Sequence, residues 1–189
     1  MQQAALFLLM YAVYPLWVLA GLLDWACHRR TNIESTGGIQ ESLMHWLMFG
    51  QIGVGMLFVA FCEVNAAVLA VVLGVFLVHE ATVYVELRYA VPRRKVGPFE
   101  QMVHSVLELL PLSSFVLLAV CAWPQAQAAS GLGGKPADWT FHGKREPWPA
   151  AYLWGAALAA ALFNALPLAQ ESIACLRFRS RTRPSPAPR

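Results

Sequence analysis

The chain has 189 residues, of which 58% are hydrophobic and only 13% are charged. This balance excludes an ordinary soluble domain, in which about a quarter of the residues are charged, so the lipid bilayer is expected to be the main solvent and partner of the protein. The net charge of +3 does not indicate a nucleic-acid partner, because the basic residues lie next to apolar stretches, where they favour an anionic membrane surface.

Five apolar stretches are long enough to cross a membrane, since a spanning helix needs about 20 mostly apolar residues. In chain order they cover residues 4–27, 43–64, 66–89, 102–124 and 150–172. The first is expected to be a retained helix and not a signal peptide, because no Lys or Arg precedes it and no small-residue cleavage site follows. We predict an all-α integral membrane protein, with one transmembrane helical domain over residues 1–175, an outer loop at 125–149 and a basic cytoplasmic tail at 176–189.

The basic residues predict the orientation of this bundle. Eleven of the fourteen fall on one side: Arg29, Arg30, Arg88, Arg93, Arg94, Lys95, Arg177, Arg179, Arg181, Arg183 and Arg189. The positive-inside rule therefore predicts an outside N-terminus and a cytoplasmic C-terminus. We expect the membrane to be the inner membrane of a bacterium.

Acidic residues and histidines gather at the predicted cytoplasmic ends of the first four helices. Residues four apart lie on one face of a helix, and this spacing relates Asp24 to His28, Glu41 to His45, and Glu100 to His104 and then Glu108. His79 and Glu86 are seven apart, which is two turns along one face. Each of the four helices thus offers an imidazole and at least one carboxylate on a single stripe.

This pattern predicts a buried metal site, because ionisable groups inside a membrane normally face a partner, a cavity or a metal. Imidazole and carboxylate together are ligands for iron, manganese and zinc, and helical bundles hold two-metal sites with inward-facing Glu and His. The number of ligands favours two ions, with iron preferred and zinc or manganese as alternatives. The predicted metal ligands are Asp24, His28, Glu41, His45, His79, Glu86, Glu100, His104 and Glu108. Glu80 and Glu34 are expected to handle protons or to support the ligands, and the fifth helix to buttress the site, with Glu171 as a further candidate.

In architecture the chain resembles the membrane-integral non-haem di-iron oxygenases, such as fatty acid desaturases and hydroxylases. In both, ligands from several helices collect at the cytoplasmic ends of a small bundle, and the carboxylate-rich set over residues 24–108 is similar to that of ferritin-like di-iron proteins. The HxxHH boxes of the first group and the ExxH motif of the second are absent, and the pairs here are Glu41-xxx-His45 and Glu100-xxx-His104. The resemblance implies two irons that use dioxygen to oxidise an acyl chain, another lipid-like molecule or a quinol. The chain has no flavin or iron–sulfur motif, so the resemblance also implies a soluble electron donor.

Other interpretations of the same residues stay open. Arg88, Arg93 and Arg94 could neutralise Glu86, Glu80 and Glu100 as simple ion pairs, although this leaves the histidines unexplained. His45, His79 and His104 could instead ligate haem in a small electron-transfer protein. A proton- or cation-conducting path, or an accessory protein with a structural cluster, is a further alternative. The four cysteines show no CxxC spacing and do not indicate a thiolate site.

Overall fold

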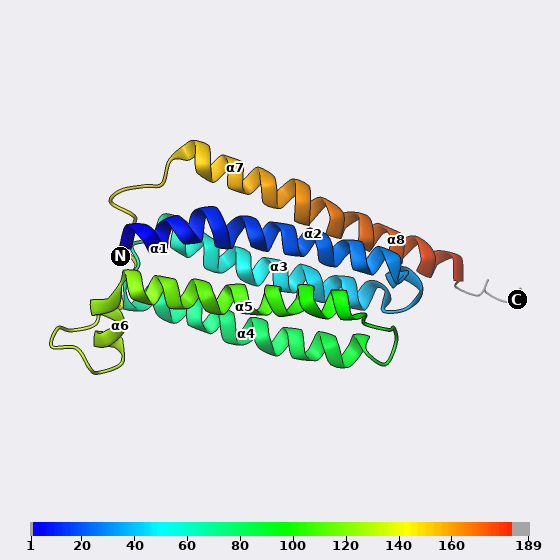
Figure 1. Cartoon of the computed structure of the whole chain (residues 1–189), viewed down its shortest axis with the longest axis horizontal. Helices are drawn as coiled ribbons and strands as arrows, with labels where there is room; N and C mark the ends of the chain where they lie inside the picture. Colours follow the sequence, from blue (N-terminus) through cyan, green and yellow to red (C-terminus); the bar gives the residue numbers. More distant parts are fainter. Residues whose placement is uncertain (1, 183–189) are drawn as a thin grey trace, which may run out of the picture.

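The computed structural model describes residues 2–182, and these form a bundle of long helices that run side by side (Figure 1). The first long helix consists of α1 (Gln2–Leu8), a π-helical turn η1 (Leu9–Val13) and α2 (Tyr14–Arg30). It is followed by α3 (Gly38–Phe61), α4 (Ala66–Ala90) and α5 (Pro98–Cys121). The short helix α6 (Trp123–Ala129) precedes the last long helix, which consists of α7 (Ala150–Ala160), a π-helical turn η3 (Ala161–Ala165) and α8 (Leu166–Thr182).

Five of these helices are long and apolar enough to cross a membrane, which confirms the predicted all-α bundle. The candidate spans are Gln3–Arg30, Gly38–Phe61, Ala66–Ala90, Pro98–Cys121 and Ala150–Thr182. Large apolar side chains such as Leu47, Val78 and Leu109 are exposed on their outer faces, as expected where hydrocarbon is the solvent. The outside position of the N-terminus stays a prediction, as does the cytoplasmic tail, of which residues 183–189 lie outside the described part.

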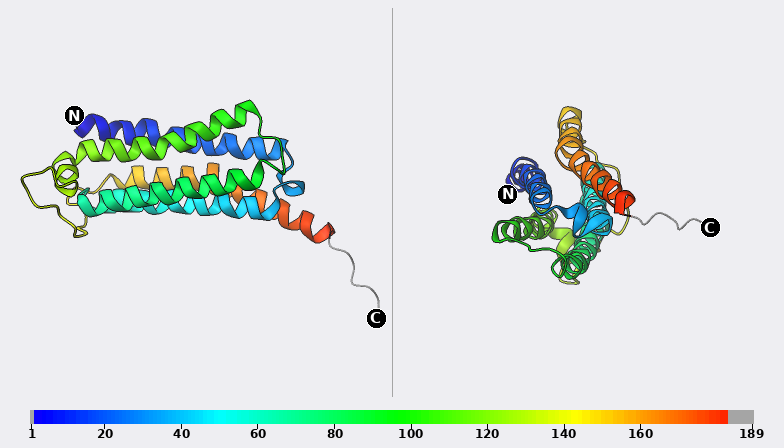
Figure 2. Two further views of the ribbon diagram at one scale, coloured as in Figure 1. Left: turned by 90° about the horizontal axis from the view of Figure 1, so that it is seen from below. Right: turned by 90° about the vertical axis from the view of Figure 1, so that its right-hand side faces the viewer.

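The helices pack unevenly around the bundle. α3 pairs with α4, α2 pairs with α5, and α8 packs against α2 and α3. α7, by contrast, stands away from the other helices, as the yellow ribbon at the top of the end-on view in Figure 2 shows. The last helix is therefore close to the bundle at one end only. We call the end of the bundle where α8 packs against the other helices the site end; the connections 31–37 and 91–97 lie there.

Two prolines explain the two π-helical turns. η1 ends just before Pro15 and η3 ends just before Pro167. A proline inside a helix lacks an N–H and clashes with the carbonyl group four residues earlier, and a wider turn accommodates it. Pro111, in contrast, lies inside the continuous helix α5. Single π turns in long helices are frequent at functional sites, and both turns here border the cavities described below.

The end opposite the site end is closed by the loop before α7. The Asn65 side chain caps α4 by accepting a hydrogen bond from the amide of Val68. It also donates to Asp138 Oδ2 at 3.0 Å and to the Thr140 carbonyl at 2.6 Å. The loop is thereby fixed to the start of α4. It is also joined to the end of α3, where the Lys144 ammonium donates to the carbonyls of Val59 and Cys62.

Candidate metal centre

Polar side chains are buried together at the site end of the bundle. His28 and Glu41 are 0% exposed and Glu86 is 1% exposed, which is unusual for ionisable residues in apolar helices. An ionisable group near the middle of a spanning helix costs about 2.5–3.5 kcal/mol on insertion scales. We call the set the His/carboxylate cluster, and its members are Asp24, His28, Glu41, His45, Glu86, Glu100, His104 and Glu171.

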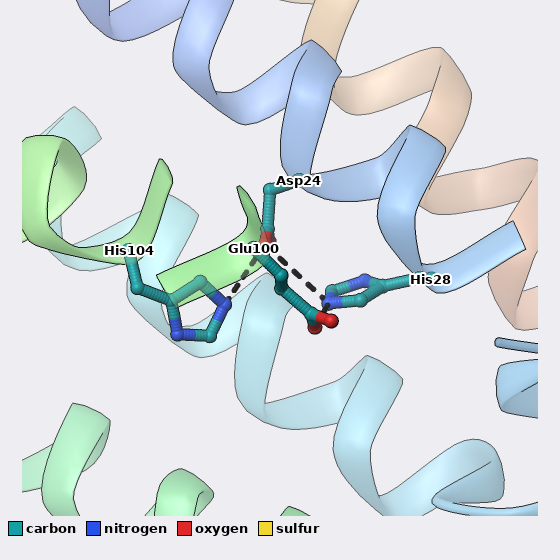
Figure 3. A group of neighbouring side chains, drawn as sticks. All are labelled: Asp24, His28, Glu100 and His104. Carbon is teal, nitrogen blue, oxygen red and sulfur yellow. Dashed lines mark hydrogen bonds and ion pairs between the residues drawn. The ribbon is translucent and has the colours of Figure 1, made fainter. Parts of the chain in front are cut away.

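One group of four ligands joins α2 to α5. Asp24, His28, Glu100 and His104 each place a ligand atom within 4.8 Å of the others. Figure 3 shows Asp24 between the two imidazoles, with its Oδ1 atom 2.9 Å from His104 Nε2 and 3.5 Å from His28 Nε2. The i and i+4 spacing on both helices turns these pairs toward each other, and the pairing of α2 with α5 brings them together.

A second group shares His28 with the first. His28, Glu41 and His45 also place ligand atoms within 4.8 Å of one another. The rings of His28 and His45 are stacked, with centroids 4.4 Å apart and planes 12° apart. Glu86 on α4 extends this group, because its Oε1 atom lies 3.9 Å from His45 Nε2. With Nδ1 protonated, His28 has one free ring lone pair and can ligate an ion in one group only, so in a two-ion site the other group would rely on its remaining ligands.

Glu171 on α8 orients both stacked rings. Its Oε2 atom lies 3.0 Å from His28 Nδ1 and its Oε1 atom lies 3.2 Å from His45 Nδ1. An ionised carboxylate only accepts hydrogen bonds, so each Nδ1 carries a proton and each Nε2 of a neutral ring keeps its lone pair. Carboxylates that fix metal-binding histidines in this way are common in metal sites. The sequence left the role of Glu171 open, because a single carboxylate on the fifth helix has no histidine at helical spacing.

Arg94, from the connection between α4 and α5, also belongs to the site. Its Nε atom donates to Glu41 Oε1 at 2.7 Å, and its Nη1 atom donates to Glu100 Oε1. The pair with Glu100 was foreseen in the ion-pair interpretation, whereas Glu41 was not expected as a partner. Burial alone would lower the pKa of Arg94, but these two carboxylates hold it above its usual value.

The cluster holds more carboxylates than guanidinium groups. Asp24, Glu41, Glu86, Glu100 and Glu171 contact the histidines or Arg94, and Arg94 is the one guanidinium among them. With neutral histidines, five carboxylates and one guanidinium leave four negative charges. Two divalent cations would supply the opposite charge.

Four buried ligand atoms in the cluster have no hydrogen-bond partner. They are His28 Nε2, His45 Nε2, Glu41 Oε2 and Glu86 Oε1. Leaving a buried polar group unsatisfied costs about 1–3 kcal/mol, so four in one cluster are an expensive arrangement unless something binds there. Their lone pairs are the donor set that iron, manganese or zinc prefers.

A small cavity of about 100 Å³, the polar cavity, adjoins the cluster. The histidines and carboxylates that line it are Asp24, His45, His79, Glu86, His104 and Glu108. The Nδ1 atom of His79 is buried without a partner. Asn164 lines the cavity from η3 and donates to the Val18 carbonyl at 3.2 Å. A lone Asn in the apolar run ALFNALPL was the sequence signal for this residue, and sequence reasoning missed it.

The structure places six of the nine predicted metal ligands in the two ligand groups and the other three along the polar cavity. Asp24, His28, Glu41, His45, Glu100 and His104 lie in the two ligand groups, and His79, Glu86 and Glu108 line the polar cavity. The two predicted proton-handling residues are in neither set. Glu34 is half-buried in the turn Ile33–Ser35, and Glu80 is half-buried on α4.

Gly37 is needed for the position of Glu41. A Cβ atom at residue 37 would lie 1.5 Å from Glu41 Oε2. The next residue, Gly38, adopts a positive φ of 66°. The role of Gly37 is different, because it allows a carboxylate to approach the backbone closely.

Comparison of the chain with protein-family models, with curated proteins and with solved structures finds no match.

Proposed function

We propose that the protein is a membrane-bound di-metal oxidoreductase, with two irons held by the His/carboxylate cluster. The observation that carries the proposal is the set of four ligand atoms without a hydrogen-bond partner, buried inside this carboxylate-rich cluster. Zinc or manganese would suit the same ligands. The basic residues next to the site end support a position facing the cytoplasm of a bacterial inner membrane.

The proposed chemistry is oxidation of a lipid-like molecule or a quinol. Bound iron would supply dioxygen chemistry: hydroxylation of a C–H bond uses one oxygen atom of dioxygen, two electrons from a soluble donor and two protons, and releases water. The protein's own residues position the metal ligands. Glu171 fixes the two stacked imidazoles, and Arg94 holds the carboxylates of Glu41 and Glu100.

The structure gives less support to the two alternatives. A cavity of about 100 Å³ is small for a porphyrin, since pockets for ligands of that size measure about 300–1,000 Å³. A conducting path needs polar groups or water along the whole bundle. Here a second cavity adjoins the polar cavity on the side of the opposite end of the bundle. It is lined almost entirely by apolar side chains such as Met56, Val72 and Leu118.

Metal analysis of the purified protein tests the proposal. We expect about two metal ions per chain in the wild type, without the Soret band of haem. His28→Ala should lose at least one ion because its Nε2 atom is a candidate ligand in both groups, and Glu41→Ala should lose one. His142→Ala, on the opposite loop, is the matched control and should keep both. Unchanged metal content in His28→Ala and Glu41→Ala would contradict the proposal, and a stoichiometric Soret band would favour haem.

A further inference from the structure

A larger, apolar cavity of about 510 Å³ lies beside the polar cavity. Its walls come from the first long helix, α3, α4, α5 and α7, and it fills the space left where α7 stands away from the bundle. Trp17 and Ile52 line both cavities. Trp17 stacks on Phe49 with ring centroids 5.8 Å apart, so these side chains form the partition between the two cavities.

Two tyrosines hold this cavity open. Tyr14 on α2 donates to the Ala156 carbonyl of α7, and Tyr152 on α7 donates to the Met10 carbonyl of η1. These bonds tie α7 to the first long helix across the gap, without filling it. Leu57 and Trp154 line the cavity and are also exposed on the lipid-facing surface. The cavity therefore opens sideways toward the bilayer.

We propose that the apolar cavity binds one unbranched acyl chain, whose terminal end points toward the His/carboxylate cluster. This inference rests on the proposed function and names its substrate class. The volume lies within the range of small-molecule pockets, and apolar walls suit a hydrocarbon chain.

The size of the polar cavity distinguishes a chain from a quinol. A quinol would place its ring in the polar cavity and its tail in the apolar one. An apolar cavity that holds benzene measures about 150 Å³, whereas the polar cavity measures about 100 Å³. A substituted ring would therefore fit poorly there, whereas an acyl chain that ends at Trp17 stays within the apolar cavity.

Lys144 supplies the matching site for an anionic head group. Its Nζ atom lies 5.1 Å from the ring centroid of Trp148, which lines the cavity at the end opposite the cluster. Two of its donors reach the carbonyls of Val59 and Cys62, and an ammonium group has three. A carboxylate beside Trp148 would lie near this ammonium group, so we expect a fatty acid to lie with its head toward Lys144 and its terminal carbon at Trp17.

Photolabelling with two palmitic acid probes tests the position and direction of the chain. One probe carries a diazirine at the terminal carbon and the other carries it next to the carboxyl group. We expect the first to label the segments around Trp17 and Ile52 and the second to label those around Lys144 and Trp148. The reversed pattern, or uniform labelling of all lipid-facing helices, would overturn the proposal.

Cavity-filling variants make the test specific. Gly53 lines the cavity, and a Cβ atom there meets nothing within 4 Å, so Gly53→Leu adds bulk to the cavity without a clash at Cβ. We expect labelling by the terminal probe to fall about tenfold, as overfilling a site typically costs 1–3 kcal/mol. Gly50→Leu, on the exposed face of the same helix, is the matched control and should label normally. Ala156→Leu fills the cavity from the opposite wall and should repeat the loss.

Metal content measured on the same samples separates the two proposals. Gly53→Leu should keep its metal while it loses the label. Labelling that persists in both Gly53→Leu and Ala156→Leu would overturn the acyl-chain site alone. Normal labelling of a wild-type protein without metal would contradict the di-metal function and leave the acyl-chain site supported.

Discussion

The Nδ1 atom of His28 lies 3.0 Å from Oε2 of Glu171, which joins the first and last long helices of the bundle. The second oxygen of the same carboxylate lies 3.2 Å from Nδ1 of His45. One side chain therefore sets the tautomers of two stacked imidazoles. The metal-binding capacity of the cluster should depend on a residue that need not touch the metal.

Glu171→Gln should weaken metal binding about 10- to 100-fold, the usual effect of losing a group that orients a ligand. An amide offers one acceptor and one donor group, so it satisfies one Nδ1–H and opposes the other, which favours the wrong tautomer at one ring. Competition with a chelator of known affinity measures the loss. Glu146→Gln, in the opposite loop, removes the same charge and should bind like the wild type; equal affinity in Glu171→Gln would refute the orienting role.

Arg94→Gln should destabilise the metal-free protein by about 3–5 kcal/mol, because it leaves buried carboxylates without their partner. The carboxylates concerned are those of Glu41 and Glu100. Thermal unfolding in detergent, with and without added metal, measures the effect. The loss should be smaller with metal, since a cation supplies the missing positive charge. The exposed Lys95 is the control, and Lys95→Gln should change the melting temperature little.

Gly37→Ala should displace the Glu41 carboxylate, since the new Cβ atom would lie 1.5 Å from its Oε2 atom. We expect the ion held by the group of His28, Glu41 and His45 to be lost and the other to be kept. Metal analysis checks this directly. Gly97→Ala, where a Cβ atom meets nothing within 4 Å, should keep both ions, and a Gly37→Ala protein with full metal content would rule out the close approach.

The loop that closes the opposite end should loosen in acid. The pKa of Asp138 is lowered from 3.8 to about 2 by hydrogen bonds from Thr140 and Asn65. A group whose pKa is lower in the folded state stabilises the fold. This contribution is complete above the unfolded-state pKa and is lost as the pH falls through the folded-state pKa. Pepsin cleavage of residues 130–149, normalised to a denatured substrate at each pH, should therefore rise between about pH 4 and pH 2.

Asp138→Asn is the control for this pH dependence, because it removes the titrating group. Its loop should be cleaved more readily at pH 4 and should show little further rise toward pH 2. A wild-type loop whose cleavage does not change over this range would contradict the role of the Asp138 carboxylate.

Several features of the site could be predicted because they depend on local sequence. The helical spacing of Asp24 with His28 and of Glu100 with His104 predicted that each pair shares a face, and the structure brings both pairs into one group. Helical spacing could not distinguish Glu34 from the other acidic residues. Glu34 lies in a turn and not on a helix stripe, because the connection after α2 places it there. Glu171 and Arg94 have no histidine at helical spacing, and their contacts depend on how separate elements pack.

The sequence by itself determined that the chain is an all-α membrane bundle with four of its five histidines and most of its carboxylates toward one end, because hydropathy and helical periodicity are local properties. Only the tertiary structure decided that Glu171 fixes two imidazoles, that Arg94 bridges Glu41 and Glu100, and that an apolar cavity adjoins the cluster. These features depend on the rotation and separation of helices far apart in the chain. The packing of whole side-chain surfaces sets the rotation and the separation of the helices, and neither can be inferred from residue spacing along one helix.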